Sequence, residues 1–325
     1  MMRMRVLTET DLTDAVLDVL DDVAVTCVQV HRGALVDPPG DVVEAHVARE
    51  SVDGLVARLR GLGVEARGAI TLDEVATWIS QPALRADEEV PGSAADAMVW
   101  PSIVQQAYDD SELNWTFMGF IVLATLLAAV AIVTDSPILT VGAMVIGPEF
   151  GAVVAVSLAV VRRRPRLLRL ALRTLAVGFT VAILVTSALA WVARQLGWVT
   201  TAAVTRNRAA TSFIYHPDHW SFIVALIAGA AGVLAMTSSR RGGLTGVFIS
   251  VTTIPAAANV GVGLALGEWA EVRGSVVQLV VNILGMAVAG WLTLQSQKQV
   301  WTRVSRHRLV RRRSVGGEVV SRYRP

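Results

Sequence analysis

The residue best suited to chemistry is Glu149, which lies in the middle of the apolar stretch 136–161, SPILTVGAMVIGPEFGAVVAVSLAVV. An acidic residue inside a membrane span costs about 2.5–3.5 kcal/mol on insertion scales, so its presence indicates a function. Desolvation favours its neutral form, which makes it a candidate proton carrier or cation ligand. The alternative is a structural carboxylate paired within a helical bundle. Gly147 and Pro148 precede it, and proline interrupts a helix because it lacks a backbone donor.

A second apolar stretch, residues 244–266, is also interrupted, with Pro255 near its middle and Asn259 one turn later. Broken backbone at membrane depth survives only inside protein or beside a water-filled cavity. Asn259, and Asn282 in a later stretch, either bind a solute or hydrogen-bond neighbouring helices. The candidate residues for binding a solute or ion are therefore Gly147, Pro148, Glu149, Pro255, Asn259 and Asn282.

Other kinds of chemistry find no support in the sequence. The five histidines are scattered without metal-ligand spacing, and no nucleophile elbow, phosphate loop or dinucleotide fingerprint is present. Cys27 is the single cysteine, so a disulfide within the chain is excluded, and we expect it to be a small buried apolar residue. We therefore expect no enzyme activity, no metal and no cofactor.

The composition is that of a membrane protein. The 325 residues are 53% hydrophobic, with a mean hydropathy of +0.53. Six apolar stretches are long enough to span a bilayer: 115–133, 136–161, 170–193, 220–236, 244–266 and 275–294. We expect a six-span α-helical domain over residues 115–295, with the second and fifth spans broken, followed by a basic tail over 296–325.

The basic residues predict how these spans are oriented. Seventeen of the 21 Lys and Arg residues after position 114 fall on one side of the six-span arrangement, which places both termini in the cytoplasm. The arginine-rich loop that begins at Arg162 is first an orientation signal. It is also a candidate contact for anionic lipid headgroups, through Arg162, Arg163, Arg164 and Arg166. Because membrane position already accounts for these charges, we expect no nucleic-acid partner.

The two interrupted spans occupy matching positions in two halves of the membrane domain. An offset of 107 residues places Pro148 on Pro255 and aligns three spans of one half with three of the other. Three is an odd number, so the second half would run inverted relative to the first. Paired interrupted segments in inverted halves are typical of transporter binding sites. The chain also has GxxxG spacing at Gly147–Gly151 and Gly263–Gly267, which indicates close helix packing or a homo-oligomer contact.

The first 114 residues have a different character, with 21 acidic residues against eight arginines. Strand patterns at 4–7, 23–31, 42–47 and 64–72 alternate with helix patterns at 11–19 and 51–62, and 33–40 reads as a loop. The order β-α-β-β-α-β predicts a ferredoxin-like α/β domain over residues 1–72. Residues 73–114 form a connector that includes an amphipathic helix.

Two motifs resemble a known family of bacterial membrane proteins. They are DSPILTVGAMVIGPEFG at 135–151 and GVFISVTTIPAAANVGV at 246–262, and with the acidic front domain and the segment YDDSELNW they resemble the family called domain of unknown function 389. The resemblance takes in most of residues 1–295. Many members look like SPLMGP where this chain has GPEFG, so Glu149 belongs to a subset. The resemblance implies a membrane architecture and supplies no reaction or substrate.

Two functions of different classes fit these observations. The first is a secondary transporter or channel for a small solute or ion in a bacterial inner membrane, with its site between the two interrupted spans. The second is a membrane-anchored sensor whose N-terminal domain binds a small ligand. An anchor has no need of two broken spans, so the sequence favours transport.

Overall fold

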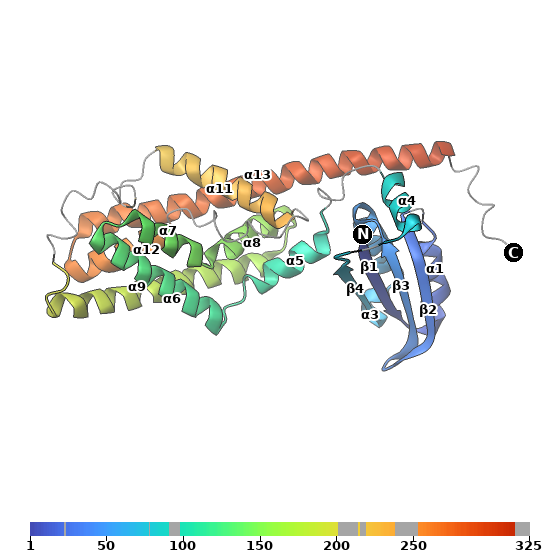
Figure 1. Cartoon of the computed structure of the whole chain (residues 1–325), viewed down its shortest axis with the longest axis horizontal. Coiled ribbons are helices and arrows are strands. Elements are labelled where there is room, and N and C mark those ends of the chain that lie inside the picture. Colours follow the sequence, from blue (N-terminus) through green and yellow to red (C-terminus); the bar gives the residue numbers. More distant parts are fainter. Residues whose placement is uncertain are drawn as a thin grey trace. The chain divides into compact units, whose positions relative to one another are not determined.

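The computed structural model describes residues 1–22, 24–77, 79–90, 98–200, 214, 219–237 and 253–315, and side chains within these ranges except at 88–89 and 300–315. The chain divides into two compact units (Figure 1). The N-terminal unit contains Met1–Ile103, and the helical unit contains Val104–Met236 and the described residues from 253 to 299. Each unit is described separately below.

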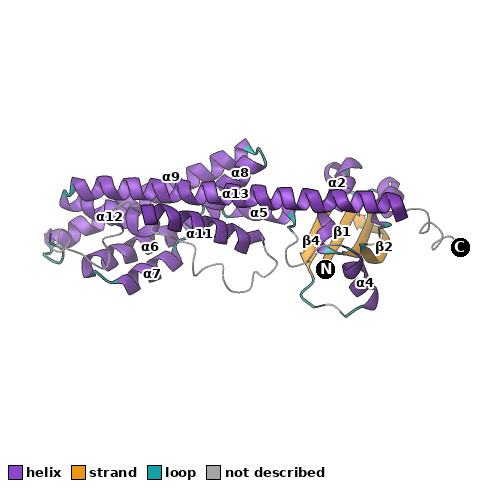
Figure 2. Ribbon diagram, turned by 90° about the horizontal axis from the view of Figure 1, so that it is seen from above, coloured by secondary structure: helices purple, strands orange, loops and turns teal. Residues whose placement is uncertain are grey.

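The N-terminal unit is built on a four-stranded antiparallel sheet (Figure 2). The strands lie in the order β2-β3-β1-β4. Its elements follow the predicted order β-α-β-β-α-β. Alternate residues of β1 are buried, and together with apolar residues of α1 and α2 they form one core. The elements are β1 (Met2–Thr8), α1 (Thr13–Leu20), β2 (Val25–Val36), β3 (Pro39–Val47), α2 (Val52–Gly61), α3 (Val64–Arg67), β4 (Ala69–Glu74) and α4 (Gln81–Glu89).

Three local predictions for this unit are wrong. The expected loop at 33–40 is almost entirely strand, since Val36 pairs with Pro39 and only two residues connect β2 to β3. Pro38 and Pro39 indicated a turn in this region but did not show that it has only two residues. Residues 64–67 are helical, because Gly63 takes a left-handed conformation (φ +80°) that ends α2 and allows one more helical turn before β4. Cys27 is exposed, and it lies where the register between β2 and β3 shifts.

The helical unit contains four helices that are long and apolar enough to cross a membrane, among the residues that the structure describes. They are α6 (Trp115–Thr134), α9 (Pro165–Gln195), α11 (His219–Thr237) and the part of α13 (Trp269–Val315) that ends at Gln299. These helices expose large apolar side chains, as expected of surfaces that face lipid; examples are Leu123, Ile227 and Leu284. The chain is a membrane protein. The helix α5 (Trp100–Asp109) leads into this unit.

The second and fifth predicted spans differ from these four. The second is a bent pair, α7 (Pro137–Ile146) and α8 (Glu149–Val161), with 55° between the two axes, and the pair passes as a fifth span if counted together. This confirms the predicted break. The fifth predicted span is described only as α12 (Thr253–Leu266), since residues 244–252 lie outside the described part of the chain. Six spans and the inverted repeat therefore stay predictions.

The helix ends of the second span explain its course. Asp135 takes a left-handed conformation at the C-terminus of α6 and therefore ends that helix. Ser136 is the cap of α7, and its hydroxyl accepts a hydrogen bond from the Leu139 N–H at 3.4 Å. Pro137 follows at the first helical position, where the missing N–H has no consequence.

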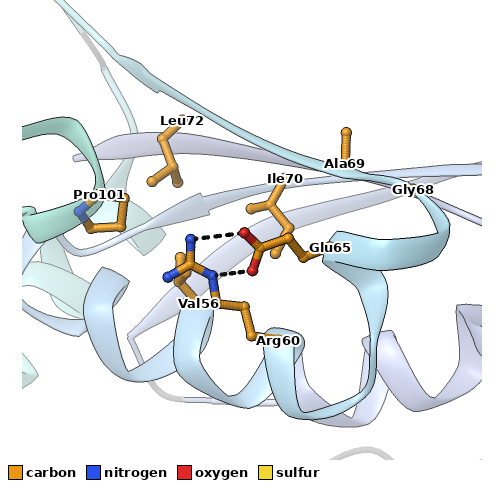
Figure 3. A pocket seen from close by; sticks show the side chains of 8 residues that line it. All are labelled: Val56, Arg60, Glu65, Gly68, Ala69, Ile70, Leu72 and Pro101. Carbon is orange, nitrogen blue, oxygen red and sulfur yellow. Dashed lines mark hydrogen bonds and ion pairs between the residues drawn. The ribbon is translucent and has the colours of Figure 1, made fainter. Parts of the chain in front are cut away.

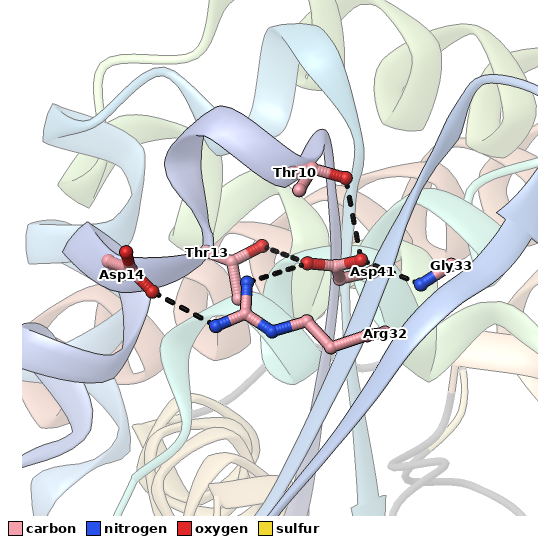
Figure 4. Close-up of polar contacts among 6 residues, drawn as sticks. All are labelled: Thr10, Thr13, Asp14, Arg32, Gly33 and Asp41. Carbon is pink, nitrogen blue, oxygen red and sulfur yellow. Dashed lines mark hydrogen bonds and ion pairs between the residues drawn. The ribbon is translucent and has the colours of Figure 1, made fainter.

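A buried carboxylate, Asp41, joins the elements at one end of the sheet (Figure 4). It accepts hydrogen bonds from the Gly33 N–H at 2.8 Å, from the Thr13 hydroxyl at 2.7 Å and from Arg32 at 3.1 Å. The bonds from Gly33 and Thr13, followed by that from Arg32, hold the pKa of Asp41 below its ordinary value. Arg32 also pairs with the exposed Asp14.

We expect Asp41→Asn to destabilise a fragment of residues 1–103 at neutral pH. Because the folded-state pKa is lowered, the ionised carboxylate stabilises the fold above its unfolded pKa, and this contribution is lost as the pH falls through the folded value. The variant should therefore unfold earlier than the wild type at pH 7 and match it more closely in acid. Urea unfolding followed by circular dichroism measures both. Asp14→Asn, at an exposed site, is the control and should behave like the wild type.

Candidate functional site

The break between α7 and α8 lies at Gly147 and Pro148, as the sequence predicts. Gly147 has extended backbone angles, so α7 ends at Ile146 and the chain turns before α8 begins at Glu149. The last carbonyls of α7 and the first N–H groups of α8 therefore lie close to one another at the break. An acidic residue in the first turn of a helix also interacts favourably with the helix dipole.

Glu149 is fully buried, and its carboxylate meets the first residue of α12. Its Oε1 accepts a hydrogen bond of 2.6 Å from the hydroxyl of Thr253, the first residue of α12. The backbone of Gly147 packs against this carboxylate and against Ile254. A Cβ added to Gly147 would stand 2.8 Å from the Ile254 side chain. The structure thus brings Gly147, Pro148 and Glu149 to the N-terminal end of α12.

The helix α12 is the most enclosed element of this unit. It packs against α6, α7 and α9, and among its 14 residues Leu264 alone is not buried. Pro255 is the third residue of the helix, a position where proline is tolerated because the first turn has unpaired N–H groups. Small residues permit this packing. A Cβ added to Gly261 would stand only 2.9 Å from the Thr186 side chain of α9.

The far end of α12 is held by a charged side chain. Arg194 of α9 donates a hydrogen bond of 3.1 Å to the carbonyl of Ala265. Gly267 is left-handed (φ +82°), and its N–H and that of Glu268 bond to the carbonyl of Gly263. Gly267 is therefore a helix cap, whereas Gly263 packs closely against Val272 of α13, as its spacing predicted.

Asn259 connects α12 to α13. Its Nδ2 donates to the hydroxyl of Ser275 at 2.8 Å and to the carboxylate of Glu271 at 3.1 Å. Sequence reasoning missed Glu271, because the apolar pattern of the last span begins at residue 275 whereas the helix begins at Trp269. The structure therefore supports a link between helices for Asn259, and places a second carboxylate, that of Glu271, in contact with α12.

Asn282 belongs to a polar face of α13 that sequence reasoning also missed. Ser275, Gln278 and Asn282 follow Glu271 at intervals of four, three and four residues, which is the spacing of one helix face. All three are fully buried, and Gln278 Nε2 donates to Asn282 Oδ1 at 3.4 Å. The periodicity of these polar residues inside an apolar helix was the available signal.

A further carboxylate outside the spans lies beside α8. The Asp110 side chain packs on Gly151, where an added Cβ would stand 2.7 Å from it. Burial, together with the neighbouring charge of Asp109, raises the pKa of Asp110 to about 6. In the sequence this residue is one of several acidic residues before the first span, and nothing there distinguished it.

The arginines after α8 lie at the surface. Arg162, Arg163 and Arg166 are exposed and Arg164 is half-buried. Farther along, a shallow cavity of about 220 Å³ on α9 is lined by Arg166, Arg169, Leu170 and Arg173. A surface of this charge is suited to phosphate groups of lipids.

The N-terminal unit has a pocket of its own, with a volume of about 260 Å³ (Figure 3). An ion pair between Arg60 of α2 and Glu65 of α3, 2.7 Å from Nε to Oε2, forms one side. The other lining residues are mainly apolar: Val56, Gly68, Ala69, Ile70, Leu72 and Pro101.

Comparisons with known proteins agree with the resemblance seen in the sequence. Residues 144–288 match the model of the family described as Domain of unknown function (DUF389), and this range contains Glu149, α12 and the polar face of α13. An uncharacterized protein of Methanocaldococcus jannaschii is 22% identical over 200 residues, which are 62% of this chain. The match spans 60% of that relative. No solved structure matches the chain.

We expect Gly147→Ala to destabilise the protein by about 1–3 kcal/mol, because the added methyl group would overlap the Glu149 carboxylate and Ile254. Thermal unfolding in detergent measures the change. Gly142→Ala is the matched control on α7, since an added Cβ there meets only Leu127, at 3.9 Å. That control should be neutral or stabilising. Equal unfolding temperatures for the two variants would contradict the packing described at the break.

Proposed function

Residues 144–288 belong to the DUF389 family, whose description names no activity, and we propose that the protein is a transporter or channel. Its substrate would be a small solute or ion that crosses the membrane through the helical unit. Glu149 would act at the centre of the site as the carboxylate that binds a cation or carries a proton. An enzymatic role is not proposed.

One observation carries this proposal: the interrupted second span meets the start of α12 at a fully buried carboxylate, through the bond from Thr253 to Glu149. An interrupted span and a buried acidic residue each destabilise a membrane protein, and a simple anchor has use for neither. Transporters place their binding sites where such segments face one another. Carbonyls at the end of α7 and N–H groups at the start of α8 supply polar groups there.

The surroundings of the protein follow from the same proposal. We place the helical unit in a bacterial inner membrane as six spans, with both termini and the arginine-rich loop after α8 in the cytoplasm. Arg162, Arg163, Arg164 and Arg166 would contact anionic lipid headgroups. Close packing of small residues is also compatible with a homo-oligomer.

The second candidate is a sensor, and the pocket beside α2 favours it. Its apolar lining and its single ion pair, Arg60 with Glu65, suit a small molecule with an apolar body and a charged group. In this function the N-terminal unit would bind the ligand and the helical unit would hold it at the membrane. Ligand binding that changes flux would join the two candidates in one protein.

We expect Glu149→Gln to keep the fold and to reduce flux to the level of empty liposomes. The amide oxygen still accepts the bond from Thr253, but the side chain can neither ionise nor release a proton. The measurements are proton leak and an ion panel in proteoliposomes, with thermal unfolding alongside. Undiminished flux with a raised unfolding temperature would contradict the proposed role of Glu149.

The control for this test is Thr253→Val, which removes the hydroxyl donor and leaves the carboxylate in place. It should lower stability by about 1.5–3 kcal/mol, the size of a hydrogen bond to a charged group, while flux stays measurable.

The proposed orientation is tested by cysteine labelling of intact cells with an impermeant reagent. A cysteine replacing Trp198, at the end of α9, should react from outside, and one replacing Arg166 should not. The exposed Cys27 is an internal control and should also stay unlabelled until the cells are opened. Labelling of both Cys27 and Arg166→Cys in intact cells would contradict the proposed topology.

A further inference from the structure

The buried polar face of α13 carries more polar groups than helix packing requires. Ser275, Gln278 and Asn282 have no exposed surface, although each lies within an otherwise apolar helix. Of the three, Ser275 accepts a hydrogen bond from Asn259 of α12. Gln278 bonds along its own helix, to Asn282, so this bond does not join α13 to a neighbour.

Polar bonds join α8, α12 and α13 in pairs. Glu149 of α8 bonds to Thr253 of α12, and Asn259 of α12 bonds to Ser275 of α13. The hydroxyl of Ser157, on α8, donates to the carbonyl of Ala287 on α13 at 2.9 Å. These three links close a ring of helix segments. Along α13, the residues between the link to α12 and the link to α8 include Gln278 and Asn282.

One hydrogen-bond acceptor on this segment of α13 has no donor among the described residues. Gln278 Oε1 is buried and has no hydrogen-bond partner among the described residues, whereas its Nε2 is engaged by Asn282. A buried polar atom left unsatisfied costs about 1–3 kcal/mol, so a group that supplies positive charge or a donor is expected beside it. No Lys or Arg side chain is buried in the described part of the helical unit.

We propose that Gln278 and Asn282 supply oxygen ligands to a monovalent cation, Na⁺ or K⁺, held between α8, α12 and α13. Amide oxygens are ligands for hard cations, and the link through α12 brings Glu149 into the same ring as the counter-charge. Glu149 is the fully buried carboxylate of this ring and balances one positive charge, whereas Glu271, which also bonds to Asn259, is only partly buried. Sites for divalent cations generally gather several buried carboxylates. The inference rests on the proposed function and specifies its substrate or coupling ion.

The test measures thermal unfolding of the full chain in lipid nanodiscs. Sodium chloride and potassium chloride are each compared with N-methyl-D-glucamine chloride at equal ionic strength. A cation that binds the folded protein raises the unfolding temperature in a concentration-dependent manner. In Gln278→Met, which keeps the size of the side chain, the shift should disappear, while the unfolding temperature in N-methyl-D-glucamine should be unchanged or higher.

The control is Thr186→Val, because Thr186 Oγ1 is a second buried atom without a described partner and lies on α9, which is not one of the three helices of the ring. This variant should keep the full cation shift. No shift in the wild type, or a full shift in Gln278→Met, overturns the proposal. Should Gln278→Met not fold, Asn282→Leu must abolish the shift.

Failure of this inference can be told from failure of the proposed function. A shift that depends on Gln278, in a protein that gives no flux of any tested ion in proteoliposomes, would leave the cation site standing and remove transport. Flux that depends on Glu149 but not on Gln278, with no effect of cations on the unfolding temperature, would leave transport standing and remove the cation site.

Discussion

The buried carboxylate of Glu149 is the main constraint on the helical unit, and the Thr253 hydroxyl donates a hydrogen bond to it. A carboxylate without exposed surface is strongly disfavoured unless polar groups compensate it. The compensation comes from the helix that Thr253 begins, at a break where α7 ends and α8 starts. The irregular backbone of the second span and the buried position of α12 therefore require each other.

Much of this arrangement could be predicted because its cause is local. A proline next to a glycine interrupts a helix whatever surrounds it, and the sequence accordingly placed the break at Gly147 and Pro148. Alternating apolar residues likewise predicted the order of strands and helices in the N-terminal unit. What could not be predicted were pairings across the chain. Nothing local joins Glu149 to Thr253, separated by 104 residues, or Asn259 to Glu271.

The errors have a common origin. Cys27 was expected inside because cysteine is usually buried, but a register shift between two strands turns it outward. The polar face of α13 escaped notice because hydropathy averages over a window and dilutes three polar residues among apolar neighbours. Composition describes a helix as a whole, whereas function depends on the one face that is turned to its partners.

The two ends of α12 are each tied to a different helix by a charged side chain, Glu149 of α8 at one end and Arg194 of α9 at the other. Rotation of α12 alone would break the bond from Thr253 to Glu149 and the bond from Arg194 to the carbonyl of Ala265. A displacement of α8, α9 and α12 together keeps both. Any mechanical step in this protein should therefore move these three helices as a single body.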